Sequence, residues 1–282
     1  MAKCQLNLIY ALKNNQVVYV DDVENGKKCG CVCPACSSPL VAKNNGTKRE
    51  HHFAHPPQLS CEYGYETSLH LAAKEILSKA KKMVIPAVYL KFPDSYKKDI
   101  LLSSEMEIPI DSVELETRFE SVIPDVVVYA GKQKFFIEIF VTHKIDDVKL
   151  AKLKKQGVST LEIDLSEKER TISPEELSDV LLKGSEEKIW RYNAKAEKWL
   201  NRFYSAADRR PILVQGFAVH TDYCPLTGRC WRGRPYANVM DDCIYCHYCI
   251  SYKDDAVLCS GRLRVSKIED FKIPLSERKG DG

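Results

Sequence analysis

Two cysteines and two histidines bracket a short basic segment near the start of the chain. Cys33 and Cys36 lie three positions apart in CPAC, and His52 and His55 close the segment with the same spacing. Thiolate and imidazole ligands suit the tetrahedral preference of Zn²⁺, and a closed set of four protein ligands is structural rather than catalytic. The spacing therefore predicts a structural zinc site made of these four residues.

Other possible ligands surround this first site. They are Cys29, Cys31, His51 and Cys61, of which Cys61 is the best substitute. A set of free thiols with exposed histidines is the alternative, but it leaves the two bracketing pairs unexplained. The pattern predicts the site and leaves its individual ligands open.

A second group of cysteines lies in the C-terminal third. Its two pairs are Cys224, Cys230, Cys243 and Cys246. Two thiolate pairs again predict a structural Zn²⁺ site. Alternative ligands are Cys249, Cys259 and His247. The run CIYCHYC contains overlapping CxxC pairs, which cannot both serve one simple knuckle.

Guanidinium and aromatic groups alternate on the loop between these cysteine pairs. The residues predicted to bind nucleic acid are Arg229, Trp231, Arg232 and Arg234, with Tyr236 beside them. Arginine can pair bidentately with phosphate, and aromatic rings stack on unpaired bases. The loop therefore suits single-stranded or distorted DNA, although a zinc-ribbon surface for another protein fits the same residues.

Three polar residues are spaced one helical turn apart in ETSLHLAAKEILSKAKK. Glu66, His70 and Lys74 repeat every four residues, within a helix that the apolar spacing predicts over 66–82. At about 100° per residue they stay within one ~80° sector beside the apolar face. On the helix alone, a solvated row of charges is the simpler explanation.

Two acids in strand-like runs change that interpretation. Asp125 stands near the start of one strand, and Glu138 stands in the middle of the next, among phenylalanine and isoleucine. Burying an unpaired carboxylate is costly, so a cation is expected there. Carboxylates from two strands and a helix suit Mg²⁺ or Mn²⁺, which could polarise a phosphate and activate water for phosphodiester hydrolysis.

The hydrophobic pattern also predicts the elements that position these residues. Strands are expected at 5–12, 16–21, 111–120, 123–130, 134–143 and 159–165, and helices at 66–82 and 146–157. After the first two strands, the order is helix, three strands, helix, strand. This order predicts a compact α/β core.

The motifs CPAC, HFAH, ETSLHLAAK, IPDVVV and FIEI together resemble the competence protein CoiA-like family, over roughly the first 165 residues. Members of that family resemble nucleases of the PD-(D/E)xK restriction-endonuclease-like fold, whose core order is αβββαβ. The resemblance implies metal-ligand roles for Asp125 and Glu138, with Glu66 as the supporting helix carboxylate. His70 and Lys74 match the family's helix pattern as well.

The chain departs from the nuclease motif at one position. That motif places a lysine two residues after the second acid, where Phe140 stands. Lys149 on the following helix could reach back to the site, and Lys144 and Lys74 are alternatives. The predicted catalytic set is Glu66, His70, Lys74, Asp125, Glu138 and Lys149.

Four parts are expected along the chain. They are a β-hairpin and zinc-knuckle module at 1–62, a nuclease-like core at 63–170, a helical linker at 171–210 and a cysteine-rich, zinc-ribbon-like module at 211–282. In the linker, Ser173 caps a helix that starts at Pro174, and the helical pattern runs to about 205.

Composition limits the class of protein. With 44% hydrophobic and 29% charged residues among 282, the chain is typical of soluble proteins, and no run approaches the roughly 20 apolar residues of a membrane span. The N-terminus lacks the pattern of a secretion signal, so 12 cysteines in a cytoplasmic protein favour metal sites over disulfides. A net charge of +3 leaves partner choice to local clusters.

Together these features predict a metal-dependent nuclease that cleaves double- or single-stranded DNA in uptake, recombination, repair or defence. Its cofactors would be two structural Zn²⁺ ions and a catalytic Mg²⁺ or Mn²⁺, and its partners other recombination or DNA-processing proteins. The alternative is a catalytically inactive nuclease-fold protein that binds DNA or mediates recombination. A third possibility, a zinc adaptor that binds only proteins, does not explain the buried acids.

Overall fold

The computed structural model describes residues 8–47, 49–57, 59, 61, 63–169, 171–226, 228–253 and 255–278. Contacts divide the chain into two units. Unit 1 comprises Met1–Pro86 and Glu105–Asn193, and unit 2 comprises Ala87–Ser104 and Ala194–Gly282. Residues 5–7 of the first predicted strand lie outside the described residues.

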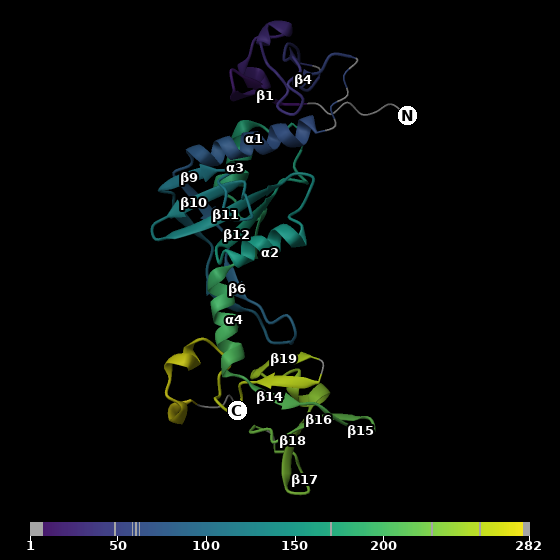
Figure 1. The fold of residues 1–282 in the computed structure, drawn as a ribbon, viewed down its shortest axis with the longest axis vertical. Coiled ribbons are helices and arrows are strands. Elements are labelled where there is room, and N and C mark those ends of the chain that lie inside the picture. Colours follow the sequence, from purple (N-terminus) through teal and green to yellow (C-terminus); the bar gives the residue numbers. More distant parts are fainter. Residues whose placement is uncertain are drawn as a thin grey trace. The chain divides into compact units, whose positions relative to one another are not determined.

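Unit 1 is built on a five-stranded sheet with the order β13-β12-β11-β10-β9 (Figure 1). The strands are β9 (Ser112–Leu115), β10 (Val126–Ala130), β11 (Gln133–Phe140), β12 (Ser159–Asp164) and β13 (Lys188–Tyr192). β11 and β12 run parallel, and the other neighbours are antiparallel. The prediction of a mixed α/β protein is confirmed.

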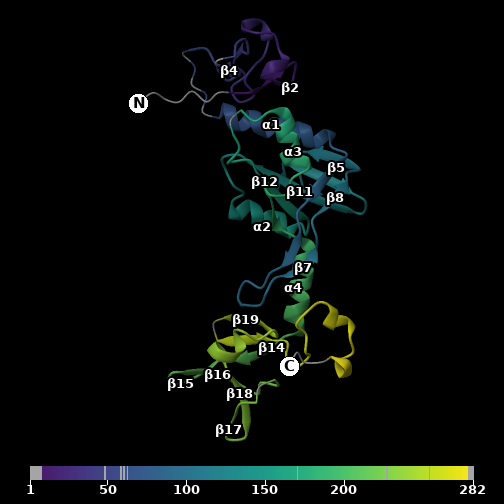
Figure 2. The ribbon, with the colours of Figure 1, turned by 180° about the vertical axis from the view of Figure 1, so that it is seen from behind.

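Helices lie on both faces of this sheet (Figures 1 and 2). α1 (Gly64–Lys79) and α3 (Pro174–Leu182) cover one face, and α2 (Asp147–Lys155) covers the other. On β11, Ile137 belongs to the core beneath α1 and α3, whereas Phe136 packs with Leu153 of α2. Since side chains alternate along a strand, Glu138 shares the α2 face with Phe136.

Smaller sheets complete unit 1. β1 (Tyr10–Lys13) pairs with β2 (Gln16–Tyr19), β3 (Val41–Lys43) with β4 (His52–Ala54), and β5 (Lys82–Ile85) with β8 (Met106–Pro109). The first hairpin turns at Asn14 and Asn15, whose positive φ angles of 52° and 62° suit asparagine in a two-residue turn.

Unit 2 contains one longer helix and several short strands. They are β6 (Val88–Leu90), β7 (Ile100–Ser103), α4 (Ala194–Ala206), β14 (Asp208–Pro211), β15 (Leu213–Gln215), β16 (Ala218–Asp222), β17 (Cys230–Trp231), β18 (Arg234–Asn238), β19 (Cys249–Lys253) and β20 (Ala256–Cys259). One core gathers around Phe92, Phe203 and Ile250, and a second core is rich in cysteine.

The continuous helical pattern predicted from 174 to about 205 is wrong in its middle. α3 ends at Leu182, β13 follows as the edge strand beside β12, and α4 begins only at Ala194. The segment KIWRY carries β-branched and aromatic residues, and pairing with β12 decides its conformation. Its Trp190 also donates a hydrogen bond from Nε1 to the carbonyl oxygen of Pro86. Residues 171–210 therefore do not form a simple helical linker.

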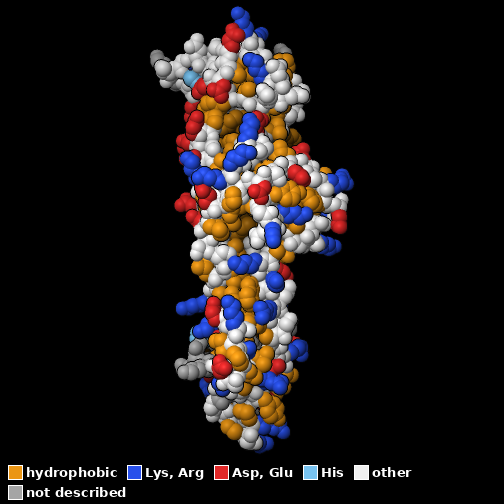
Figure 3. All heavy atoms as spheres, turned by 90° about the vertical axis from the view of Figure 1, so that its left-hand side faces the viewer, with side chains coloured by type: hydrophobic (Ala, Val, Ile, Leu, Met, Phe, Trp, Pro, Cys, Tyr) orange, Lys and Arg blue, Asp and Glu red, His pale blue; other side chains and the backbone are white. Residues whose placement is uncertain are grey.

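Charge is spread over the surface. On the face drawn in Figure 3, Lys and Arg side chains are interspersed with Asp and Glu. This distribution agrees with the small net charge of +3. Within the described residues, no helix is long and apolar enough to cross a membrane.

Candidate functional site

Three cysteines and one histidine converge at the N-terminal side of unit 1. They are Cys33, Cys36, His55 and Cys61, and their ligand atoms all lie within 4.8 Å of one another. The sulfurs of Cys33 and Cys61 are 3.9 Å apart, and Cys36 Sγ lies 3.4 Å from His55 Nε2. We call this group the sulfur cluster. Four soft donors at these distances could hold Zn²⁺.

The thiols of the sulfur cluster differ in their tendency to ionise. Burial raises the pKa of Cys33 to about 12. Burial also acts to raise the pKa of Cys36, but hydrogen bonds from Ser38 and His55 outweigh it and lower that pKa to about 6. Because zinc binds thiolates, Cys36 is the side chain best prepared to bind first.

The ligand set differs from the predicted one at one position. Cys61 stands beside the other three ligands, whereas His52 lies outside the cluster, with Nδ1 2.9 Å from the carbonyl oxygen of Glu50. His52 belongs to β4, and its backbone pairs with Lys43 of β3. The remaining spare ligands also have other partners: His51 contacts Asp21, and the thiols of Cys29 and Cys31 donate to carbonyl oxygens.

The sulfur cluster lies directly against the start of α1. A side chain at Gly64, the first residue of the helix, would place its Cβ 3.3 Å from Cys61 Sγ and 3.5 Å from Cys33 Sγ. The contact with Cys61 Sγ is tighter than ordinary packing, so glycine allows the helix to begin here. The cluster is thus joined to the helix that carries Glu66, His70 and Lys74.

Helix α1 presents these three residues at the end of the sheet. Its core side includes Leu69, Ala73 and Leu77, which are fully buried at a spacing of four. Lys74 is also buried, with only 7% of its side chain exposed, so the row is not a solvated charge row. Its ammonium group lies 2.9 Å from Glu116 Oε1 and 3.4 Å from Asp125 Oδ1.

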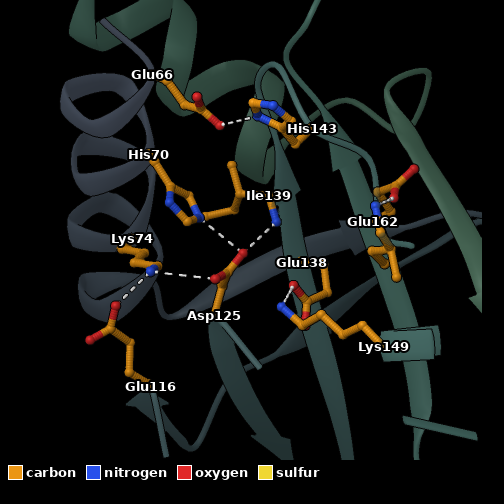
Figure 4. Close-up of polar contacts among 11 residues, drawn as sticks. Glu66, His70, Lys74, Glu116, Asp125, Glu138, Ile139, His143, Lys149 and Glu162 are labelled. Atoms are coloured by element: carbon orange, nitrogen blue, oxygen red, sulfur yellow. Dashed lines mark hydrogen bonds and ion pairs between the residues drawn. The ribbon is translucent and has the colours of Figure 1, made fainter. Parts of the chain in front are cut away.

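Asp125 immediately precedes β10 and is held by three groups (Figure 4). His70 Nε2 lies 2.9 Å from Oδ2, the Ile139 N–H donates to the same oxygen at 2.9 Å, and Lys74 approaches Oδ1. Burial would raise the pKa of Asp125, but the hydrogen bond and charge of His70, followed by Lys74 and the Ile139 N–H, hold it well below its usual range. Asp125 is therefore ionised at neutral pH.

Glu138 lies on β11 beside Asp125, with 5% of its side chain exposed. Lys149 Nζ donates to Glu138 Oε2 at 2.6 Å (Figure 4). Oε1 is buried and has no hydrogen-bond donor among the described residues, and the side chain of Glu138 contacts the Asp125 carboxylate. Burial, then the charge of Asp125, raises the pKa of Glu138 to about 8 against the opposing effect of Lys149. Two neighbouring carboxylates therefore have pKa values displaced in opposite directions.

Two further acids in this region were not predicted. Glu162 on β12 is opposite Glu138 in the parallel register, is 2% exposed, and accepts the Ile145 N–H at 3.3 Å. Glu116 follows β9 and pairs with Lys74. The alternation in STLEID, with a charged residue between leucine and isoleucine, is the signal by which Glu162 could have been found, as it was for Glu138 in FFIEIF.

These side chains line one cavity of about 180 Å³. Its acidic walls are Glu66, Asp125, Glu138, Asp146 and Glu162, and its basic walls include His70, His143, Lys144 and Lys149. We call it the carboxylate pocket. Burial would raise the pKa of Glu66, but hydrogen bonds from Thr142 and His143 lower it, and His143 Nδ1 lies 3.1 Å from Glu66 Oε1. Five of the six predicted catalytic residues line the pocket. The sixth, Lys74, does not line it but contacts Asp125, which does.

The carboxylate pocket fits a hard divalent cation by its donors. Carboxylate oxygens are the ligands that Mg²⁺ and Mn²⁺ prefer. The unpartnered Oε1 of Glu138 is a buried acceptor that such an ion would satisfy. Within the described residues, only the sulfur cluster has three or more metal-ligating atoms within 4.8 Å of one another. The carboxylates would therefore draw together around an ion.

The C-terminal residues predicted to act together are separated. Cys243 is buried, and Cys230 is exposed on β17, opposite Pro235. The arginine loop, residues 228–236, borders a second cavity of about 500 Å³ lined by Arg229, Trp231, Arg234 and Tyr236. Arg232 stacks over the Trp231 ring at 4.6 Å, and Arg229 Nε lies 2.9 Å from Asp242 Oδ2.

Comparison with known protein families finds a match over residues 16–64. No curated protein and no solved structure matches the chain. The matched segment contains β2, the whole sulfur cluster and the first residue of α1. It supports the resemblance to CoiA-like proteins for this part of unit 1. Residues 16–64 match the family model described as competence protein CoiA, N-terminal domain.

Proposed function

We propose that unit 1 is a Mg²⁺- or Mn²⁺-dependent nuclease domain of the restriction-endonuclease-like fold that hydrolyses DNA phosphodiester bonds. One observation carries the proposal. Glu138 is a buried carboxyl group whose Oε1 has no hydrogen-bond donor among the described residues, beside an ionised Asp125 in a pocket lined by five acids. A buried carboxyl oxygen without a donor is uncommon in protein interiors, and a bound cation would satisfy it.

The ligands and their supports have separate roles. Asp125 and Glu138 would hold the ion, which when bound supplies charge to stabilise the phosphate. Glu66 would support them from α1, 3.1 Å from His143. The Ile139 N–H and His70 fix the orientation of Asp125.

Lysine and histidine side chains provide the positive charge that the motif lysine would supply. Phe140 occupies the motif position and is buried. Lys149 contacts Glu138 from α2 instead, and would move to a phosphate oxygen or to the attacking water once the ion binds Glu138. His143 is largely exposed at the pocket and is placed to contact a phosphate.

Unit 2 is proposed to bind the DNA strand. Trp231 is about half exposed, and Arg234 and Tyr236 line the same cavity. This combination of rings and guanidinium groups suits stacked bases and phosphates. The CoiA match at residues 16–64 supports a role in competence. We propose that in this role the chain acts on DNA together with recombination proteins.

A cleavage assay tests the proposal. The purified full chain is incubated with linear double-stranded and single-stranded DNA, with and without Mg²⁺ or Mn²⁺. We expect metal-dependent cleavage that falls by about 10²-fold or more in Asp125→Asn and Glu138→Gln, as for loss of a main electrostatic contributor. Glu114→Gln is the matched control, because Glu114 is an exposed acid of the same sheet. Cleavage that the Asp125 and Glu138 variants retain rejects catalysis at this site.

A second candidate is a nuclease-fold protein that binds DNA or mediates recombination without cutting. Phe140 in place of the motif lysine favours it. This candidate predicts DNA affinity that falls steeply with salt, while Mg²⁺ and the acidic residues have no effect on phosphodiester bonds. The cleavage assay therefore separates the two candidates. A nuclease loses metal-dependent cleavage in Asp125→Asn, whereas a protein that only binds DNA shows no such cleavage in the wild type or in the variant.

A further inference from the structure

Five cysteines of unit 2 line one cavity of about 330 Å³. They are Cys224, Cys243, Cys246, Cys249 and Cys259. Cys249 and Cys259 face each other in register on the paired strands β19 and β20. Cys243 ends the π-helical turn Val239–Cys243, and Cys224 follows β16. Segments separated by 35 positions therefore bring thiols to one place.

The backbone around these cysteines is arranged for sulfur ligands. The Cys246 N–H donates to Cys243 O, and the Cys249 N–H donates to Cys246 O, both at 3.0 Å, so the CxxCxxC run makes two successive tight turns. The Gly261 N–H donates to Cys259 Sγ at 3.3 Å. A Cβ at Gly261 would lie 3.1 Å from that sulfur and 2.9 Å from Leu226 Cδ1, so glycine permits this close approach. Hydrogen bonds to sulfur stabilise thiolates.

The hydrophobic core around this cavity is small. Its buried members are Ala237, Val239, Cys243, Ile244, Tyr248, Cys249, Val257 and Cys259. Protein interiors pack closely, and small modules with short strands commonly depend on a bound metal to fold. A cavity lined by five thiols inside such a core is therefore most simply the place of a ligand.

We propose that this cavity binds a thiolate-ligated metal centre through four of its five cysteines, and that Cys230 has no part in it. Cys230 is exposed on β17 and does not line the cavity. This ligand set replaces the predicted Cys230 by Cys249 or Cys259, both buried beside Cys243. The proposal does not depend on the nuclease activity of unit 1.

The spacing of the sulfurs bears on the kind of metal centre. A single zinc ion with Zn–S bonds of about 2.3 Å needs its ligands close together. Among the described residues, no three of these five sulfurs lie within 4.8 Å of one another, in contrast to the sulfur cluster of unit 1. An iron–sulfur cluster spans wider thiolates, and C-x₂-C-x₂-C is a spacing that such clusters use. The shared chemistry is thiolate ligation of zinc or of an iron–sulfur cluster, which analysis of the bound metal distinguishes.

The centre would also fix the base of the arginine loop. Asp242, next to Cys243, accepts the Asn238 N–H at 2.8 Å through Oδ2, and its carboxylate lies 2.9 Å from Arg229 Nε. A metal held by Cys243 would therefore limit the motion of Asp242 and of the arginine that it binds. The aromatic and basic cavity beside this loop would be organised by the same centre.

Metal analysis of the full chain tests the proposal. The protein and its variants are purified without oxygen, and zinc, iron and acid-labile sulfide are measured. The background is Cys36→Ser, which removes a ligand of the sulfur cluster. In that background we expect one metal centre per chain to remain. It should be lost in four of the single variants Cys224→Ser, Cys243→Ser, Cys246→Ser, Cys249→Ser and Cys259→Ser, and retained in Cys230→Ser.

A measurement without cavity variants guards against unfolding. Thiol alkylation followed by mass spectrometry should find Cys230 reactive in the native protein and the cavity cysteines protected until a chelator or oxidant removes the metal. Zinc alone identifies a zinc site, and iron with matching sulfide identifies a cluster. Absence of metal in the Cys36→Ser background, or equal loss in Cys230→Ser and Cys246→Ser, would overturn the proposal.

Discussion

The two candidate metal regions of unit 1 both adjoin helix α1 but are built differently. The sulfur cluster has four soft donors within 4.8 Å, and its ligands are packed around the first residue of α1. In the carboxylate pocket, Glu66 follows the first residue of α1 by two positions. Each of Glu66, Asp125 and Glu138 pairs with a histidine or lysine side chain. One region is closed around its donors, and the other keeps acceptors facing a cavity.

This difference indicates different functions. A closed set of protein ligands leaves no position for a substrate, so the sulfur cluster is suited to holding α1 in place. The carboxylate pocket retains an unpaired oxygen and a cavity of about 180 Å³, which is where an ion and a phosphate could enter. Because α1 starts at the cluster and continues to Lys74, the closed region would brace the open one.

The largest expected effect is from removing a ligand of the closed region. Cys61→Ser should abolish zinc binding at the sulfur cluster and lower the free energy of unfolding by about 4–5 kcal/mol, the range for loss of a structural metal. His52→Ala is the matched control, because His52 lies outside the cluster. Zinc content and thermal unfolding measure both variants. If His52→Ala loses zinc and Cys61→Ser keeps it, the ligand assignment is incorrect.

The next effect concerns the open region. Lys149→Met should reduce DNA cleavage by about 10²-fold, because it removes the cation 2.6 Å from Glu138. Lys144→Met serves as the control, since the ammonium group of Lys144 lies over the Phe140 ring rather than against a carboxylate. Steady-state cleavage of linear DNA compares the two. Equal activity of both variants would argue against Lys149 as the relocated lysine.

A pH-dependent effect on stability is expected from Glu138 in the open region. The pKa of Glu138 is raised from 4.5 to about 8, so between these values the folded protein keeps a proton that the unfolded chain releases. The stability contributed by this group is therefore complete below pH of about 4.5 and is lost as pH rises through about 8. Thermal unfolding without added Mg²⁺ or Mn²⁺ should show this decline in the wild type and a weaker decline in Glu138→Gln. Parallel curves would contradict the assignment.

The smallest effect is expected in unit 2, on the arginine loop. Arg234→Ala should weaken DNA binding modestly and lower the slope of log affinity against log salt by about 1, as for loss of one phosphate contact. Trp231→Ala should weaken single-stranded DNA more than double-stranded DNA, because only unpaired bases can stack on the ring. Fluorescence anisotropy over a salt series measures both. If neither variant changes the affinity for DNA, the loop does not bind DNA.

Local patterns in the sequence were sufficient for much of unit 1. The i,i+4 apolar spacing of Leu69, Ala73 and Leu77 predicted α1, which extends from Gly64 to Lys79. The run FFIEIF predicted a buried strand, and Glu138 is buried on β11. Signals of this kind are repeated within one element, so the sequence alone is enough to detect them.

Features that depend on distant contacts were missed. Cys61, and not His52, is a member of the sulfur cluster. Which of the two reaches the cluster depends on the path of the chain before α1, and the spacing of the ligands in the sequence does not determine that path. The strand β13 forms because β12 offers an edge for pairing, and its own sequence also suited a helix. Glu116 could not be linked to Lys74, since the segment between them includes strands outside unit 1.

Direct measurement of Mn²⁺ binding tests the central claim, that the carboxylate pocket holds a divalent ion, without requiring cleavage. Titration of the zinc-loaded full chain with Mn²⁺, followed by electron paramagnetic resonance, should detect one saturable site that is lost in both Asp125→Asn and Glu138→Gln and retained in Glu114→Gln. Binding that is equal in all of these proteins, or no binding in the wild type, would contradict the account.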